Sequence, residues 1–267
     1  MKHGDPQPLG PRQAPFGLSL SKPARTNWAA RVRHGAAALA CLAAILGSAP
    51  TAAQTAPAAG EAASYKGLHA AAWRGDQAAI VRLAAGKADL DARDAHGRTP
   101  MHVAAFARQR EAIRALARAG AGLDLLEGDR YDAVTIASVA GDEETLRTLL
   151  ALGASAKQVT SRYDGTALIA AAHLGHDGVV RQLIAAGAPL DHVNNLHWTA
   201  VIEAIVLGDG GPRHQATLKA LIDAGANLQL ADRQGNTPLQ LARSRGYAPM
   251  VRMLEAAGAR ERGALRP

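Results

Sequence analysis

The sequence contains very little cysteine and few aromatic residues. Cys41 is the only cysteine among 267 residues, which excludes an intramolecular disulfide framework and a zinc site made of thiolates. Aromatic residues make up 3% of the chain, too few for a platform on which nucleic-acid bases stack. Hydrophobic residues reach 48%, much of this alanine, and charged residues 20%. This composition favours closely packed helices around a buried core.

The apolar segment at residues 36–47 is too short for a transmembrane helix, which needs about 20 residues. Arginines precede this segment and small residues follow it, and these three parts together are typical of a secretory signal peptide. We therefore expect residues 1–53 to be a disordered leader plus a signal peptide that is cleaved near Ala53. The alternative is an N-terminal anchor that is never cleaved.

The charge of the chain changes once this leader is set aside. The formal net charge is +7, which on its own would suggest binding to nucleic acid. Residues 1–53 hold six of the 30 basic residues and one of the 23 acidic ones, so the cleaved chain would carry a net charge of +2. We therefore expect no nucleic-acid partner. Residues 54–64, rich in alanine, proline and glycine, are predicted to be a flexible linker, and residues 261–267 a polar tail.

The rest of the chain repeats with a period of about 33 residues. The motif Thr99-Pro100-Met101-His102-Val103-Ala104-Ala105 recurs at Thr237–Ala242, and degenerate copies lie between them. A second landmark, an apolar cluster followed by glycine and alanine, keeps the same register. Six repeats are found, starting near residues 66, 99, 132, 166, 199 and 237. A unit of this size cannot bury its apolar face alone, but six stacked units can form one continuous core.

Each repeat carries the start and stop signals of two helices. Threonine, or Asp132 in the third copy, stands where a side chain can cap the first helix, and proline follows it in two copies. The second helix has apolar residues at helical spacing. Glycine then supplies the left-handed residue that ends this helix, at Gly120, Gly153, Gly187, Gly225 and Gly258.

These motifs resemble the ankyrin-repeat family, whose pattern is G-x-T-P-L-H-x-A-A followed by V-x-x-L-L-x-x-G-A. The resemblance covers residues 65–260. It implies an all-α repeat solenoid of about six stacked helix-turn-helix units with β-hairpin fingers between them, and protein binding as the activity. It also implies a structural hydrogen-bonding role for His69 and His102.

Candidate binding residues lie on one side of this predicted stack. The residue after the Ala-Ala step of each first helix should face the concave groove, which gives Trp73, Phe106, Val139, His173, Val206 and Ser244. Large aromatics are typical binding anchors, and arginines can steer a partner electrostatically. The predicted partner-binding set is therefore Trp73, Phe106, Tyr131, Tyr163, His173, Trp198, Arg130, Arg162 and Arg233. The alternative is that Trp73 and Phe106 fill space between repeats.

The sequence offers little for catalysis. The fifth repeat has five extra residues within 208–214, which we interpret as a flexible surface loop or as a grip for a partner. His173 and His176 are three residues apart, but no carboxylate follows at metal-ligand spacing. No catalytic motif occurs, so we expect no catalytic residue, no metal and no cofactor. An enzyme that uses the insertion and its neighbouring histidines is an alternative.

The resulting functional hypothesis is a non-catalytic, monomeric scaffold of a bacterial cell envelope that binds another protein. The signal peptide predicts a periplasmic or secreted protein, with the membrane involved only through export. The family resemblance points to an oxidative-stress enzyme such as a catalase as one class of partner. The alternative is a cytosolic or membrane-anchored adaptor with an uncleaved leader.

Overall fold

The computed structural model describes residues 54–261. The predicted leader and signal peptide, residues 1–53, and most of the predicted polar tail, residues 262–267, lie outside the described residues. The described part contains thirteen helices and one pair of short strands. None of the helices in this part has the length and apolar character needed to cross a membrane.

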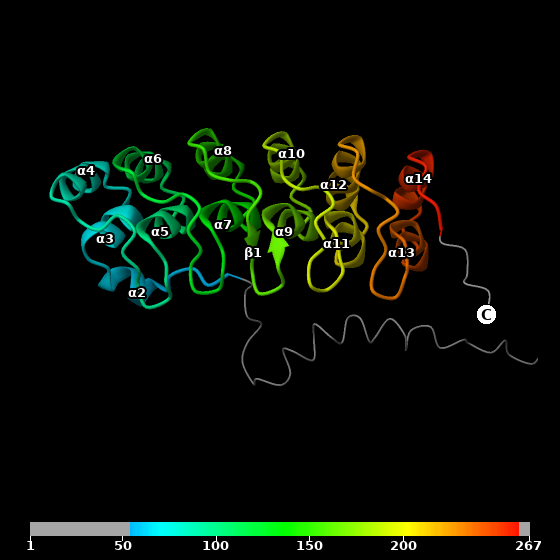
Figure 1. Ribbon diagram of the computed structural model, residues 1–267, viewed down its shortest axis with the longest axis horizontal. Helices are drawn as coiled ribbons and strands as arrows, with labels where there is room; N and C mark the ends of the chain where they lie inside the picture. The colour runs from blue at the N-terminus through cyan, green and yellow to red at the C-terminus, as the bar shows by residue number, and fades with distance from the viewer. Residues whose placement is uncertain (1–53, 262–267) are drawn as a thin grey trace, which may run out of the picture. The chain divides into compact units, whose positions relative to one another are not determined.

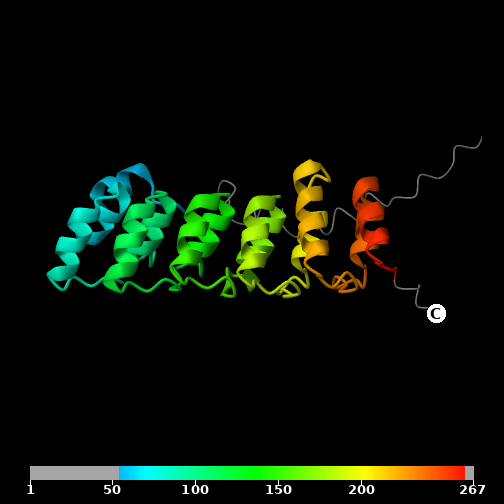
Figure 2. The same cartoon turned by 90° about the horizontal axis from the view of Figure 1, so that it is seen from above.

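Twelve of these helices form six pairs, each with one inner and one outer helix (Figure 1). The inner helices are α3 (Gly67–Arg74), α5 (Pro100–Phe106), α7 (Ala133–Val139), α9 (Ala167–His173), α11 (Ala200–Val206) and α13 (Pro238–Ser244). The outer helices are α4 (Gln77–Ala85), α6 (Arg110–Ala119), α8 (Glu143–Ala151), α10 (Asp177–Ala185), α12 (Pro212–Asp223) and α14 (Ala248–Ala256). The pairs lie side by side along the long axis (Figure 2). This arrangement confirms the predicted solenoid of six stacked helix-turn-helix units.

One core runs through the whole stack. Each outer helix contributes an apolar side chain that is fully buried between neighbouring pairs, for example Leu116, Leu149, Leu183 and Leu221. Alanines of the inner helices, such as Ala104 and Ala172, are also fully buried. Small side chains let neighbouring inner helices approach closely, which explains why so much of the apolar composition is alanine.

The predicted helix starts and ends are confirmed. The side chain of Asp132 accepts a hydrogen bond from the amide of Thr135 at 2.7 Å, and the hydroxyl of Thr199 accepts one from the amide of Ile202 at 3.3 Å. Gly120 ends α6 with a φ of 98°, in the left-handed region. The other predicted terminal glycines also have positive φ.

The segments between pairs form the fingers. One finger contains the strand pair β1 (Val159–Thr160) and β2 (Gly165–Thr166), which is antiparallel with Val159 opposite Thr166. Other fingers close through two backbone bonds, such as those from the amide of Asn194 to the carbonyl of Trp198 at 3.0 Å and from the amide of His197 to the carbonyl of Asn194 at 2.9 Å. The predicted β-hairpin fingers are therefore present, most of them as tight turns.

Neighbouring fingers are joined by backbone hydrogen bonds, which we call finger rungs. The amide of Gly128 donates to the carbonyl of His96 at 2.9 Å, and the amide of Ser161 donates to that of Arg130 at 2.8 Å. A third rung runs from the amide of Asn195 to the carbonyl of Tyr163 at 3.0 Å. The fingers therefore form a connected edge along the stack.

The three central fingers have a non-glycine residue where the outer ones have glycine, and in the middle one this residue is Asp164, with a φ of 50°. Arg130 has a φ of 66° and His197 a φ of 64°, both in the left-handed region. Each costs about 1 kcal/mol relative to a relaxed backbone. The sequence predicts this irregularity, because Gly97 and Gly235 hold the equivalent positions.

The prediction of a flexible linker at residues 54–64 is wrong where the chain forms helix α2 (Ala59–Ser64). Glu61 of this helix forms an ion pair with Arg98, whose side chain is fully buried. Arg98 Nη1 also donates to the carbonyl of Thr55 at 3.1 Å, and Ala62 is buried. This segment packs against the stack because it supplies polar partners to the buried guanidinium of Arg98. The composition of residues 54–64 alone does not indicate this contact.

The insertion in the fifth repeat is also not a free loop. Residues from Pro212 onward lengthen α12, which spans twelve residues. Asp209 Oδ1 accepts a hydrogen bond from the amide of Gly211 at 2.8 Å. The hydroxyl of Tyr247, in the next repeat, donates to the carbonyl of Gly208 at 2.9 Å. The extra residues are thus held at both ends by ordinary structural contacts.

Candidate functional site

The inner helices place six side chains in one row. We call this the inner row: Trp73, Phe106, Val139, His173, Val206 and Ser244. Each residue lies at the last or next-to-last position of its inner helix, one per repeat. Trp73 and Phe106 are half-buried and pack against the core, whereas His173 and Ser244 are exposed. The two large aromatics therefore fill space between repeats and present part of their surface to solvent.

The aromatic residues near the fingers differ in exposure. Tyr131 is only 7% exposed and belongs to the core, so the prediction that it binds a partner is wrong. Burial raises the pKa of its hydroxyl to about 12. Tyr163 and Trp198 are half-buried and keep some accessible surface. A partner can therefore reach Tyr163 and Trp198 but not Tyr131.

The three predicted arginines are exposed and connect neighbouring fingers. Arg130 Nη1 lies 3.0 Å from Asp164 Oδ1, and Arg162 Nη2 lies 3.3 Å from Asp129 Oδ1. Arg233 Nη2 donates to the carbonyl of Asn195 at 2.8 Å. Ion pairs this exposed contribute little to stability, so these side chains can exchange their contacts for those of a partner.

His69 and His102 act as the resemblance implies. His102 Nε2 lies 2.9 Å from the carbonyl oxygen of Leu125, and Nδ1 accepts from the amide of Thr99 at 3.1 Å. Burial lowers the pKa of His102 to about 4, so the ring is neutral at pH 7. His69 Nε2 lies 2.9 Å from the carbonyl oxygen of Arg98. Both rings tie an inner helix to the following finger.

A carboxylate that sequence reasoning missed lies beside the inner row. Glu203 Oε2 is 3.4 Å from His173 Nδ1, and its Oε1 accepts from Asn194 Nδ2 at 3.1 Å. The Glu203 side chain is 6% exposed, and burial raises its pKa to about 7. The signal in the sequence is a glutamate at a position where the other repeats have an apolar residue.

His176 and His214 occupy equivalent structural places. His176 Nε2 lies 3.1 Å from the carbonyl oxygen of Val139, and His214 Nε2 lies 3.0 Å from that of His173. Their Nδ1 atoms contact Arg213 and Asp209, respectively. These rings connect successive repeats at the turn between inner and outer helices. Within residues 54–261, no three metal-ligating side chains come together.

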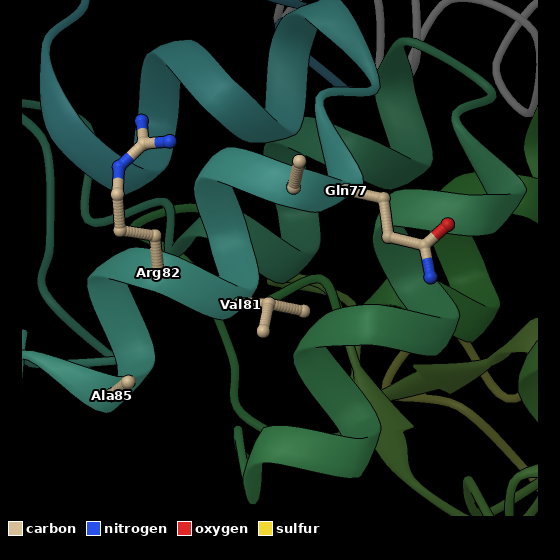
Figure 3. A pocket seen from close by; sticks show the side chains of 5 residues that line it. Gln77, Val81, Arg82 and Ala85 are labelled. Carbon is tan, nitrogen blue, oxygen red and sulfur yellow. The ribbon is translucent and has the colours of Figure 1, made fainter.

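The first outer helix carries a shallow hollow on its exposed face (Figure 3). Gln77, Val81, Arg82 and Ala85 of α4 line this hollow of about 580 Å³. Val81 is 56% exposed because no further outer helix covers it among the described residues. The lining offers one cationic group and no convergent set of polar atoms, so it has no recognisable chemistry.

Known families match the chain over most of its length. A family model described as ankyrin repeats in three copies matches residues 68–160 and 134–232. A second model, described as ankyrin repeats in many copies, matches residues 212–255. The matched segments follow the repeats seen in the structure.

Individual relatives give the same result. The ankyrin repeat protein YahD of Escherichia coli strain K12 is 41% identical over 100 residues, which cover 37% of this chain and 50% of YahD. The chain thus spans about half the length of this curated relative. The crystal structure of an ankyrin repeat domain, ABAYE2397 of Acinetobacter baumannii AYE, is 44% identical with a TM-score of 0.69, covering 72% of this chain and 98% of that one. The crystal structure of the ankyrin repeat domain of Bcl-3 is 28% identical with a TM-score of 0.66, and the match covers 74% of this chain and 88% of that one.

Proposed function

Because the chain belongs to the ankyrin-repeat family, we propose that it is a non-catalytic scaffold that binds a partner protein through its inner row and fingers. Ankyrin repeat domains are generally protein-binding scaffolds and typically have no catalytic activity.

The observation that carries the proposal is the half-buried pair Trp73 and Phe106 at neighbouring places of the inner row. Large aromatic side chains that are held by the core yet partly accessible are typical anchors of protein interfaces. The exposed Arg130, Arg162 and Arg233 of the fingers can steer an acidic surface of the partner toward this row.

The experiment is affinity capture with the tagged chain from the native cell envelope, followed by mass spectrometry. The variant carries Trp73→Ser and Phe106→His together, because the sixth and fourth repeats have serine and histidine at these places. We expect at least a tenfold loss of the captured protein, while circular dichroism stays helical. Val81→Ser, on the outer face of α4, is the control and should capture as well as the wild type. Equal capture by the double variant would place the binding surface elsewhere.

We further propose that the protein acts in the periplasm or outside the cell, after cleavage of the predicted signal peptide near Ala53. N-terminal sequencing of the exported protein tests this, and a start near Gln54 is the expected result. An intact Met1 on cytosolic protein would contradict export and favour the cytosolic adaptor.

An oxidative-stress enzyme such as a catalase is the partner class that we propose from the family resemblance. Size-exclusion chromatography of the chain mixed with catalase from the same cells should show one complex. Separate elution would exclude this partner class and leave the scaffold proposal in place.

A further inference from the structure

Glu203 is the single acidic residue in the six inner helices. The equivalent place holds an alanine or a larger apolar residue in the other repeats: Ala70, Val103, Ile136, Ala170 and Leu241. Five repeats therefore fold without a carboxylate at this position. The stack itself does not require Glu203.

The carboxylate is buried without a full positive charge beside it. Its oxygens contact the amide group of Asn194 and the imidazole of His173, and no lysine or arginine of residues 54–261 forms an ion pair with it. A buried carboxylate that lacks a cation costs several kcal/mol. The raised pKa of Glu203 expresses this cost, and burial also lowers the pKa of His173. With a pKa of about 7, Glu203 is partly ionised at neutral pH, and a cation beside it would favour the charged form.

The surrounding contacts hold the carboxylate in place. Asn194 is 4% exposed, and its Oδ1 accepts from the amides of Leu196 and Trp198, each at 3.0 Å. The same side chain therefore fixes both the finger and Glu203. On the solvent side, His173 ends α9 in the inner row, and its side chain is 45% exposed. The half-exposed imidazole of His173 therefore links the buried carboxylate of Glu203 to the accessible surface of the inner row.

We propose that the His173–Glu203 pair is a recognition site for a lysine or arginine side chain of the partner protein. The inference rests on the proposed function, that the inner row binds a protein. An ammonium or guanidinium group that passes beside His173 and reaches Glu203 Oε2 supplies the positive charge that the fold omits. Charge complementarity favours this occupant, because a partner carboxylate would add a second negative charge beside the first.

The test uses a random peptide library selected on the full-length chain. We expect the enriched peptides to share a lysine or arginine at one position. Replacing that residue with acetyl-lysine or citrulline should weaken binding to the wild type at least tenfold. Glu203→Gln should weaken binding of the basic peptide to the same extent, and the neutral peptide should bind both proteins equally. This double-mutant cycle isolates the contact between the two groups.

Two further variants serve as controls. Glu111→Gln makes the same substitution at an exposed glutamate on the outer helix α6, so it should leave peptide binding unchanged. Glu203→Ala introduces the residue that the first and fourth repeats already carry, and it should fold and lose the preference for a basic residue. Circular dichroism verifies that each variant folds.

The outcomes separate this inference from the proposed function. A selection without enrichment of a basic residue, or one whose basic peptides bind Glu203→Gln as tightly as the wild type, overturns the inference. If such peptides still lose binding to the Trp73→Ser, Phe106→His variant, the scaffold function stands. If they bind that variant fully, the inner row is not the binding surface.

Discussion

Arg98, His102 and Glu203 are ionisable side chains in the interior, and each has a different environment. Arg98 is balanced by the carboxylates of Glu61 and Asp94. His102 is neutral between backbone groups of the finger that follows it. Within residues 54–261, the polar contacts of Glu203 are with the imidazole of His173 and the amide of Asn194. The cost of burying Arg98 is therefore offset by two carboxylates, and the cost of burying His102 is avoided because its ring is neutral. The cost of burying the Glu203 carboxylate is not offset by a cation.

The neutral state of His102 makes stability dependent on pH. Its pKa is about 4 in the folded protein and about 6.5 when unfolded, so the unfolded chain binds an extra proton as the pH falls below 6.5. We predict that this residue removes about 2 kcal/mol of stability between pH 7 and pH 5. His102→Gln should lose less stability than the wild type over this range, as measured by urea unfolding at both pH values.

Glutamine is the matched replacement, because the sixth repeat has Gln240 at this place and its Oε1 accepts from the amide of Thr237 at 2.9 Å. The variant keeps the helix start and removes the titrating group together with the contacts of His102 Nε2 to the carbonyls of Leu125 and Tyr131, a loss that applies at both pH values. Glu203 titrates with the opposite sign, but it is present in both proteins and cancels in the comparison. Parallel stability curves for the two proteins would contradict a neutral His102.

Among the elements, the fingers depend on close backbone approach. A methyl group added to Gly128 would lie 2.6 Å from the carbonyl oxygen of His96, the acceptor of a finger rung. Gly128 does not have a positive φ, so the close contact is the whole reason for glycine here. Backbone atoms cannot move aside as the end of a flexible side chain can.

We predict that Gly128→Ala destabilises the protein by about 1 to 3 kcal/mol, because it breaks this rung and leaves a backbone amide unpaired. Gly60→Ala is the control, since no atom lies within 4 Å of its added methyl group and it lies in helix α2. That variant should be neutral or stabilising by up to about 1 kcal/mol. Thermal unfolding measures the stability of both variants. Equal melting temperatures would contradict the stabilising role of this finger rung.

An element could be predicted from sequence when the residues that determine it lie close together in the chain. The helix caps at Asp132 and Thr199 and the terminal Gly120 are local signals repeated in register, so the stack was predictable. Helix α2 was not, because its partner Arg98 lies 37 residues from Glu61. The site was predicted only in part. The inner row follows from the period, whereas the burial of Tyr131 and the contact of Glu203 with His173 depend on side-chain packing between repeats.

At the scale of the whole molecule, each repeat contacts mainly its neighbours. A terminal repeat has a neighbour on one side only, so its other side needs a separate cover. At the N-terminal end, residues 54–64 cover Arg98 through Glu61 and the carbonyl of Thr55. Tyr65 adds a hydrogen bond from its hydroxyl to Asp94 Oδ2 at 2.7 Å. This segment therefore works as a cap of the first repeat.

We predict that a chain beginning at residue 65 is less stable than one beginning at residue 54 by about 2 kcal/mol, because Arg98 loses one of its two carboxylate partners. The melting temperature should fall by roughly 5 °C. Hydrogen exchange should accelerate in α3 and α5 and stay unchanged in α13 and α14. Uniform acceleration along the chain would instead indicate one cooperative unit.

The two edges of the stack are connected by different means. Finger rungs of backbone hydrogen bonds join the first four fingers along one edge. On the helix–turn edge, His176 and His214 join the third, fourth and fifth repeats by reaching back to the carbonyls of Val139 and His173. Bending the solenoid toward either edge must stretch the connections along the other. These connections therefore fix the distance between neighbouring repeats. A partner that contacts both Trp73 and His173 must match a spacing of three repeats.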